Sequence, residues 1–339
     1  MVAEGRKSCS RLHIGNTLAG QHARSPPDLD KLSFVGVTTA QSAATRLFPA
    51  WAKELGLRDV RLVGHDLPIH AEREQYRDLV RRIKSEEHER GALITTHKID
   101  LFEACRDLFD RIDESALLCG ETSCLSKRDG LLYARATDIV SAAESIDEFV
   151  PVDHFQETAA EVLCLGAGGS AIAITIHLLR REARTGRPPR ITVVNRSQGR
   201  LDAMRAIHAR VNASADVAYV LNVDPLVNDE LIGKLPPGSL VINATGMGKD
   251  TPGSPISDAA RFPAGGLVWE VNYRGELRFL KQALAQRRER TLLVHDGWRY
   301  FIHGWATVIE EVFDLQIQDD QLARLAALSE AEHKPAERV

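Results

Sequence analysis

Apolar and polar residues along the chain follow two alternating patterns. Short, mostly apolar runs that predict β-strands occur at residues 32–37, 59–63, 91–98, 162–165, 191–194, 217–221, 239–243 and 266–271. Between these runs, apolar residues recur every three or four positions, as Leu47, Trp51 and Leu55 do, which predicts amphipathic helices. Because strands alternate with helices, we expect an α/β protein with a doubly wound parallel sheet in its second half.

The apolar run at 162–165 leads into a glycine-rich turn, Gly166-Ala167-Gly168-Gly169-Ser170, and then into an apolar helix. A strand, a tight turn and a helix N-terminus together expose backbone N–H groups and the positive end of the helix dipole, which suits a pyrophosphate. Gly166 would permit the turn, and Gly168 would let a phosphate approach the backbone. A plain tight turn is the alternative interpretation of this glycine pattern.

The next strand, at 191–194, ends in polar residues that bear on the choice of cofactor. A carboxylate at this point selects NAD through the ribose hydroxyl, whereas guanidinium groups accommodate the 2′-phosphate of NADP. The chain carries no acid here and offers instead Asn195, Arg196, Ser197 and Arg200. We therefore predict NADP rather than NAD, the alternative being an arginine surface exposed to solvent.

Polar residues with catalytic potential follow other strands. The strand predicted at 91–98 ends in Thr95, Thr96, His97 and Lys98, and Asp138 follows a hairpin that Asp129-Gly130 predicts. A partly desolvated ammonium group can donate a proton to the oxygen of a ketone during hydride transfer, and a carboxylate can position it. We expect Lys98 and Asp138 to do this at a cleft between two domains. A surface lysine and a helix N-cap are the alternatives, and we expect His97 to face away and to be structural.

The composition limits the class of protein. A length of 339 residues suits two domains. The net charge of −4 gives no general attraction to nucleic acid or to an anionic membrane. Five cysteines without a C-x-x-C pair suggest neither a disulfide framework nor a zinc site, so we expect no metal and a reducing, cytoplasmic location. No apolar run is long enough for a membrane span.

These observations predict five regions. They are a basic, disordered leader (1–30), an α/β substrate domain (31–138), a Rossmann-type NADP domain (139–295), a C-terminal helix that returns to the substrate domain (296–325) and a polar tail (326–339). The aromatic run from Trp298 to Trp305 is the basis for the returning helix, because the helices of the nucleotide domain offer it no evident apolar partner.

The order of these motifs, from Phe34 to Phe313, resembles that of the shikimate dehydrogenase family, including its quinate-type relatives. The matching elements are Ser42, Lys98, Ala136-Thr137-Asp138, Gly166 to Gly169, Asn195-Arg196-Ser197 and Ile242-Asn243-Ala244-Thr245. The resemblance implies an NADP-dependent dehydrogenase of aromatic amino acid biosynthesis in which Lys98 and Asp138 are catalytic. It also implies that Ala244 and Thr245 lie beside the nicotinamide ribose and that Ser42, Thr95, Ser123, Tyr273 and His303 contact the substrate.

The substrate half departs from the family pattern. Ser42-Ala43-Ala44-Thr45 replaces a Ser-x-Ser-Pro element, Ser123 stands where an asparagine is usual, and His303 stands near an expected glutamine. We therefore expect oxidoreduction of a small cyclic polyhydroxy acid of the shikimate type, by a monomer or homodimer. Quinate, an aminated analogue or another hydroxylated ring remains open as the substrate. A catalytically silent NADP-binding regulatory protein is the alternative of another class.

Overall fold

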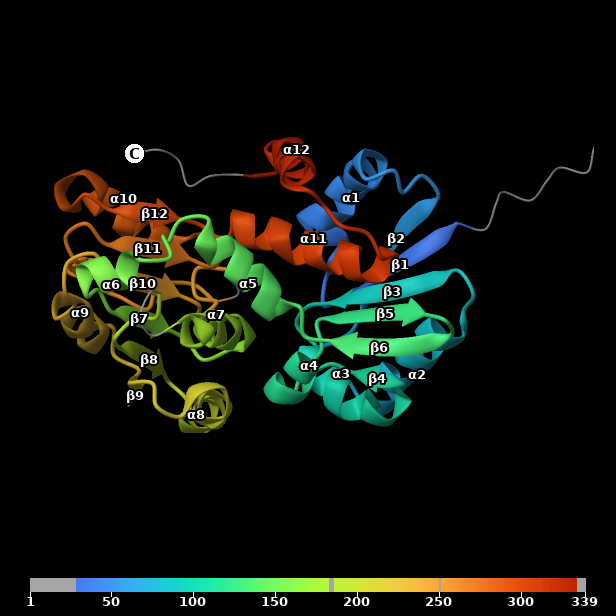
Figure 1. The fold of residues 1–339 in the computed structure, drawn as a ribbon, viewed down its shortest axis with the longest axis horizontal. Helices are drawn as coiled ribbons and strands as arrows, with labels where there is room; N and C mark the ends of the chain where they lie inside the picture. Colours follow the sequence, from blue (N-terminus) through green and yellow to red (C-terminus); the bar gives the residue numbers. More distant parts are fainter. Residues whose placement is uncertain (1–28, 183–185, 250, 334–339) are drawn as a thin grey trace, which may run out of the picture.

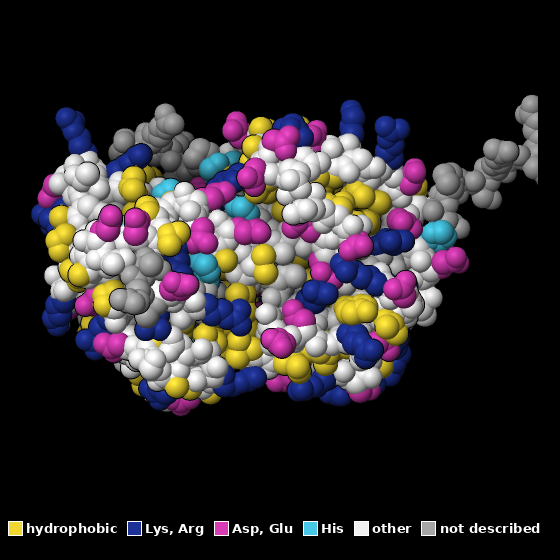
Figure 2. Space-filling model, viewed as in Figure 1, with side chains coloured by type: hydrophobic (Ala, Val, Ile, Leu, Met, Phe, Trp, Pro, Cys, Tyr) yellow, Lys and Arg dark blue, Asp and Glu magenta, His cyan; other side chains and the backbone are white. Residues whose placement is uncertain are grey.

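The protein consists of two α/β domains joined by two long helices (Figure 1). The structure, a computed structural model, describes residues 29–182, 186–249 and 251–333. The predicted leader lies outside these residues except at its end, where Asp30 already begins strand β1. Within the described ranges, no helix is long and apolar enough to span a membrane. Acidic and basic side chains are mixed over the visible face of the molecule (Figure 2).

The first domain is built on a mixed six-stranded sheet in the order β2-β1-β3-β5-β6-β4. Its strands are β1 (Asp30–Gly36), β2 (Val60–Asp66), β3 (Glu89–Ile94), β4 (Arg111–Ile112), β5 (Cys124–Arg128) and β6 (Leu131–Arg135). Its helices are α1 (Ala43–Glu54), α2 (Arg73–Ser85), α3 (Lys98–Cys105) and α4 (Glu114–Cys119). The β5–β6 hairpin turns at Asp129 and Gly130, which both adopt positive φ, as the Asp-Gly pair predicts.

The second domain is a parallel six-stranded sheet in the order β12-β11-β10-β7-β8-β9, the doubly wound arrangement expected of a Rossmann-type domain. Its strands are β7 (Val162–Leu165), β8 (Ile191–Asn195), β9 (Val217–Leu221), β10 (Leu240–Asn243), β11 (Leu267–Glu270) and β12 (Leu293–His295). Its helices are α6 (His154–Thr158), α7 (Gly169–Arg180), α8 (Gln198–Asn212), α9 (Pro225–Gly233) and α10 (Arg278–Arg290). The prediction of a two-domain α/β fold is confirmed.

Two helices run between the domains, α5 (Asp138–Asp147) and α11 (Trp298–Phe313) (Figure 1). Trp298, Ile302, Trp305 and Ile309 of α11 share one apolar core with Leu32 and Phe34 of β1 and with α1. The C-terminal helix thus returns to the substrate domain, as the aromatic run predicts. The opposite face of the same sheet packs on α2 and α3 through a second core that contains Val35 and Tyr76.

Two expectations about element boundaries are wrong. The third strand ends at Ile94 rather than at residue 98, and Lys98 is instead the first residue of α3. Helix α12 (Asp319–Ser329) also continues past residue 326, where the polar tail was predicted to begin. Ser329 is fully buried and accepts a hydrogen bond from the indole Nε1 of Trp51 at 2.9 Å, so a core contact holds the end of α12 in place.

Candidate active site

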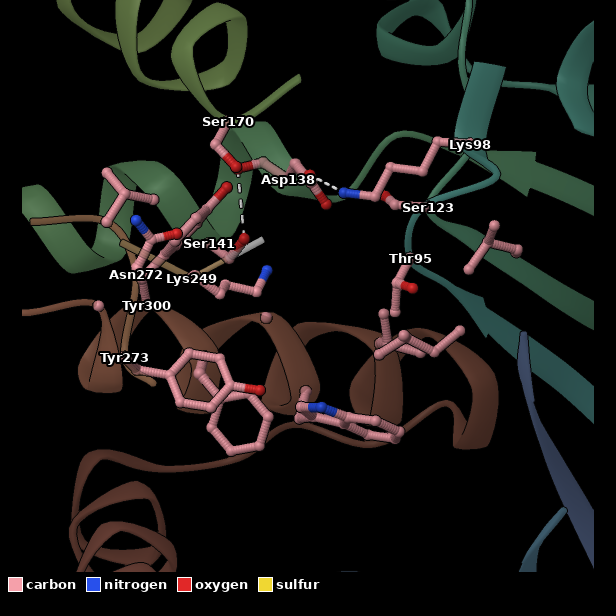
Figure 3. A pocket seen from close by; sticks show the side chains of 18 residues that line it. Thr95, Lys98, Ser123, Asp138, Ser141, Ser170, Lys249, Asn272, Tyr273 and Tyr300 are labelled. Atoms are coloured by element: carbon pink, nitrogen blue, oxygen red, sulfur yellow. Dashed lines mark hydrogen bonds and ion pairs between the residues drawn. The ribbon is translucent and has the colours of Figure 1, made fainter. Parts of the chain in front are cut away.

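The two residues predicted to be catalytic lie together in a cleft at the junction of the domains (Figure 3). Lys98 begins α3 just after strand β3, and Asp138 begins α5 just after strand β6. The Lys98 ammonium forms an ion pair with the Asp138 carboxylate, and the two side chains are 20% and 15% exposed. A partly buried pair of this kind keeps its charges close to a ligand while bulk water screens them only weakly.

A third charged group, Glu121, lies close to this pair. Burial opposes the charge on Lys98, but the carboxylates of Asp138 and Glu121 outweigh that effect and raise the Lys98 pKa above its usual value. Burial also raises the pKa of Glu121, and the Lys98 ammonium limits the rise. Lys98 is therefore positively charged at neutral pH and can donate a proton.

Ser123 and Thr137 are hydrogen-bonded to each other next to the Lys98–Asp138 pair. The Ser123 hydroxyl accepts a hydrogen bond from the Thr137 backbone N–H at 2.8 Å and lies 3.0 Å from the Thr137 hydroxyl. This contact ties the segment before β5 to the residue that precedes Asp138. Ser123 also lines the cleft, so it can contact a ligand there.

Two adjoining cavities, of about 210 and 660 Å³, meet at Lys98. Five side chains line both of them besides Lys98, namely Thr95, Lys249, Tyr273, Phe301 and Trp305. Ser42 lines the larger cavity, where its hydroxyl also accepts a hydrogen bond from the Ala44 N–H at the start of α1. The cavities thus bring together Ser42, Thr95, Ser123 and Tyr273, four of the five predicted substrate contacts.

The fifth predicted substrate contact, His303, lies elsewhere. Its ring is buried between α11 and α5, with Nδ1 3.0 Å from Glu144 and Nε2 2.8 Å from Glu148. The residue after it, Gly304, lines the cavity instead. The prediction that His303 contacts the substrate does not fit this position, because the helical rotation of about 100° per residue turns its side chain toward α5.

His97 is buried at 1% exposure, and its Nδ1 lies 3.0 Å from the Tyr76 hydroxyl. This packing contact within the substrate domain agrees with the structural role expected from the sequence. The reason differs from the expected one, since His97 sits in the turn before α3 and not on a strand.

The glycine-rich turn has the geometry that a phosphate site requires. Gly166 has a φ of +118°, and a Cβ there would stand 2.4 Å from the carbonyl oxygen of Ala244, so only glycine fits. A Cβ at Gly168 would meet no atom within 4 Å. The backbone of Gly168 thus faces open space at the N-terminus of α7, where an anion can approach it.

The polar residues predicted for the 2′-phosphate surround the end of β8. Asn195 ends the strand, and Arg196 and Arg200 are exposed. The Ser197 hydroxyl caps α8 by accepting a hydrogen bond from the Arg200 N–H at 3.4 Å. Two solvent-accessible guanidinium groups beside a helix N-terminus fit a phosphate monoester.

Ala244 and Thr245 follow β10 and are fixed by a buried polar network. Asn243 donates a hydrogen bond to Glu270 at 2.7 Å and accepts one from the Thr245 hydroxyl at 2.6 Å. Asn272 donates to the same glutamate, also at 2.7 Å. Burial raises the pKa of Glu270 to about 7, and the hydrogen bonds from Asn272 and Asn243 oppose this rise. The network holds the ends of β10 and β11 at the edge of the cleft.

Several residues in the cleft were missed by reasoning from the sequence. Besides Glu121 and Gly304, they are Ser141, Lys249, Asn272 and Tyr300. The Tyr300 hydroxyl bonds Ser170 of α7 and Ser141 of α5, and burial raises its pKa well above the usual value. The spacing of Tyr300, Gly304 and Val308 at four-residue intervals could have indicated one helix face toward the cleft.

A glycine turn at the carboxyl end of a parallel sheet, beside a cleft between two domains, is typical of nicotinamide-dependent dehydrogenases. No family model matches the chain. A shikimate dehydrogenase (NADP(+)) of Symbiobacterium thermophilum is 29% identical over 69% of this chain and 74% of its own length. A protein of the same name from Rhodopseudomonas palustris is 26% identical over 79% and 85%. The chain is thus similar to shikimate dehydrogenases over more than two thirds of its length.

Solved structures share the fold at lower sequence identity. A quinate dehydrogenase from Corynebacterium glutamicum, in complex with NAD, superposes with a TM-score of 0.69 and is 20% identical, covering 90% of this chain and 99% of that one. A 5-ketofructose reductase of a Gluconobacter strain superposes with a TM-score of 0.66 at 21% identity and covers the same shares. At such identities the likeness establishes the architecture alone.

Proposed function

We propose that this protein is an NADP-dependent oxidoreductase that interconverts a secondary alcohol and a ketone on a small cyclic hydroxy acid of the shikimate and 3-dehydroshikimate type. One observation carries the proposal: the Lys98–Asp138 ion pair lines a cavity at the junction of the substrate domain and the glycine-turn domain. The names of the curated relatives support the same reaction and the same cofactor.

NADP, when bound, supplies or accepts the hydride. The residues of this chain then handle the proton. In reduction, the Lys98 ammonium donates a proton to the ketone oxygen as negative charge develops on it, and the carbonyl becomes a secondary alcohol. Asp138 holds the ammonium toward the oxygen and balances its charge. In oxidation, the neutral Lys98 amine accepts the proton of the hydroxyl group.

We assign the cofactor contacts to three groups of residues. Gly166, Gly168, Gly169 and Ser170 would hold the pyrophosphate at the start of α7, while Ala244 and Thr245 would lie beside the nicotinamide ribose. Arg196 and Arg200, with Asn195 and Ser197, would bind the 2′-phosphate.

The preference for NADP is testable with Arg196→Asp, which should shift the ratio of NADP to NAD affinity toward NAD at least tenfold. Arg261→Asp, at a surface ion pair with Glu289 in the same domain, is the control.

Quinate, an aminated analogue or another hydroxylated ring is the alternative substrate. The solved structures with this fold support the alternative, because they include a quinate dehydrogenase and a 5-ketofructose reductase. A silent NADP-binding regulatory protein is less consistent with a cleft that retains both Lys98 and Asp138. Cytoplasmic location and a monomeric or homodimeric state stay predictions.

The experiment that tests the proposal measures NADPH oxidation at 340 nm with purified protein and a panel of ring ketones, and the reverse reaction with shikimate and quinate. We expect turnover with at least one of them, dependent on Lys98. No turnover on any ring, together with tight NADPH binding, would support the regulatory protein instead.

A further inference from the structure

The cavity beside Lys98 has two walls of different chemistry. The polar wall carries Lys98, Asp138, Ser123 and Thr95. The opposite wall is formed by α11, whose residues Phe301, Gly304, Trp305 and Val308 follow the spacing of one helix face. Figure 3 shows the ring of Tyr273 on this side, across the cavity from Lys98 and Asp138.

The aromatic wall is fixed by the core behind it. The Trp305 ring meets Phe34 edge to face at 5.0 Å between centroids, and it is 4% exposed. Phe301 lies 4.6 Å from Tyr273 and stacks on Trp298 at 5.0 Å. Rings packed on several sides cannot rotate away to admit water or a polar group, so the wall keeps its apolar surface.

Gly304 is unusual in this wall. It lies in the middle of a 16-residue helix, where glycine is less favourable than alanine because it loses more backbone entropy. No helix or core contact requires it, since a Cβ at this position would meet no atom within 4 Å. The space in front of Gly304 belongs to the cavity. A glycine that packing does not need is explained if the occupant of the cavity needs that space.

We infer that Gly304 determines substrate specificity, and that the substrate is a ring ketone acid whose ketone faces Lys98 while an apolar face of the ring packs on α11 over Gly304. This inference rests on the proposed function and narrows its substrate class. A ring with hydroxyl groups on every side would place some of them against the rings of Phe301 and Trp305, where they lose hydrogen bonds to water.

The first test compares two ring ketones that differ only in hydroxyl groups, 3-dehydroshikimate and 3-oxocyclohex-1-ene-1-carboxylate, in NADPH-dependent reduction. A site built to bind ring hydroxyls rejects the analogue without them by about 10⁴-fold, whereas an apolar wall does not. We expect kcat/KM for the ring without hydroxyls to be within tenfold of that for 3-dehydroshikimate, or higher. A preference of 10³-fold or more for 3-dehydroshikimate would overturn the inference and leave the proposed function intact. If neither ring nor any other cyclic ketone is reduced, the function and the inference fail together.

The second test changes Gly304 itself. We expect Gly304→Val to lower kcat/KM on the better ring ketone at least tenfold by filling the cavity, with the dissociation constant of NADPH unchanged within twofold. Gly304→Ala should have a smaller effect and should not lower the melting temperature, which shows that the fold is kept. Gly233→Val, at a helical glycine with the same open surroundings in α9, is the matched control. Unchanged kcat/KM in Gly304→Val would show that the substrate does not occupy this space, and a loss of kcat/KM matched by an equal weakening of NADPH binding would assign the space to the cofactor instead.

Discussion

At the scale of single residues, two carboxylates and one ammonium decide the chemistry of the cleft. Asp138 and Glu121 stabilise the charged form of Lys98. Burial disfavours both the positive charge of Lys98 and the negative charge of Glu121. Removal of one charge therefore changes the pKa values of the remaining groups. A variant of Lys98 leaves two acids facing each other, which is a larger disturbance than the loss of a proton donor alone.

We predict that Lys98→Ala and Asp138→Asn each reduce turnover by a factor of about 100 or more, the usual loss when a positioned acid–base group is removed. NADPH affinity, measured by fluorescence titration, should change less than twofold. Because the two groups act on one hydroxyl, the double variant should be hardly slower than the worse single variant. Losses that multiply would contradict a joint role.

Glu121 should make cofactor binding depend on pH. A Cβ at Gly169 would stand 3.1 Å from its Oε2 atom, so the carboxylate lies against the glycine turn. Burial raises the Glu121 pKa to about 7, so the group is neutral below this pH and negative above it. A negative Glu121 repels a pyrophosphate at the start of α7, which means that NADPH affinity should suffer as pH rises through 7.

The comparison of wild type with Glu121→Gln isolates this effect, since the 2′-phosphate also titrates near pH 6. We expect similar NADPH affinities at pH 6 and about fivefold or more tighter binding by the variant at pH 8.5. Glu310→Gln is the control, because burial raises that pKa too but the carboxylate accepts a hydrogen bond from Ile317. An equal affinity of both proteins at pH 8.5 would disprove the role of Glu121.

At the scale of elements, the sequence predicts best what local patterns encode. The apolar run and glycines of β7 and the start of α7 follow from residue spacing alone, and so do the Asp-Gly hairpin and the apolar face of α1. The position at which β3 ends could not be predicted from the sequence. Thr95 and Thr96 suit a strand, and nothing local marks Lys98 as the start of a helix. Reasoning from the sequence missed Glu121 because its place in the site depends on its contact with Gly169, which is 48 positions away in the chain.

Helix α8 carries a pH-sensitive contact. His208 is buried, with Nε2 2.8 Å from the Thr175 hydroxyl of α7 and Nδ1 2.8 Å from the Tyr219 hydroxyl of β9. Burial lowers its pKa to about 4. The folded pKa lies below the unfolded value near 6.5, so this contribution to stability is complete above pH 6.5 and declines as pH falls toward 4.

We predict that the nucleotide domain loses about 2 kcal/mol of its unfolding free energy between pH 7.5 and pH 5 through His208 alone. Urea unfolding of wild type and of His208→Gln at the two pH values measures this. The variant should be less stable at pH 7.5 and should lose less stability on acidification. Parallel losses in both proteins would assign the acid sensitivity to other groups.

His303 joins helices α5 and α11. Replacing it can therefore distinguish a structural role from a substrate-binding role. Burial opposes the charge on His303, yet hydrogen bonds to Glu144 and Glu148 outweigh it and raise the His303 pKa. We predict that His303→Asn lowers stability by about 1–3 kcal/mol while the KM of the ring substrate stays within twofold. A rise in KM without a change in melting temperature would restore His303 as a substrate contact.

At the scale of the whole molecule, the site exists only where the domains meet. Lys98 and Asp138 follow strands β3 and β6 of one domain and the glycine turn follows β7 of the other, while α5 and α11 connect them (Figure 1). Periodicity predicts each domain and the return of α11, because these depend on apolar faces that need a partner. It does not predict which residue of α11 reaches the cavity, since one position along a helix turns the side chain by about 100°.

Helix α11 also fixes the distances between three parts of the molecule. Tyr300 bonds Ser170 at the glycine turn, Gly304 lines the substrate cavity, and Ile309 is anchored in the core of the first domain. Tyr300 and Gly304 are one turn apart, or about 6 Å along the axis. Substitutions on that turn can therefore reshape the space for the substrate while the distance from cofactor to substrate stays constant. A protein with this layout can acquire a new substrate without having to rebuild its hydride-transfer geometry.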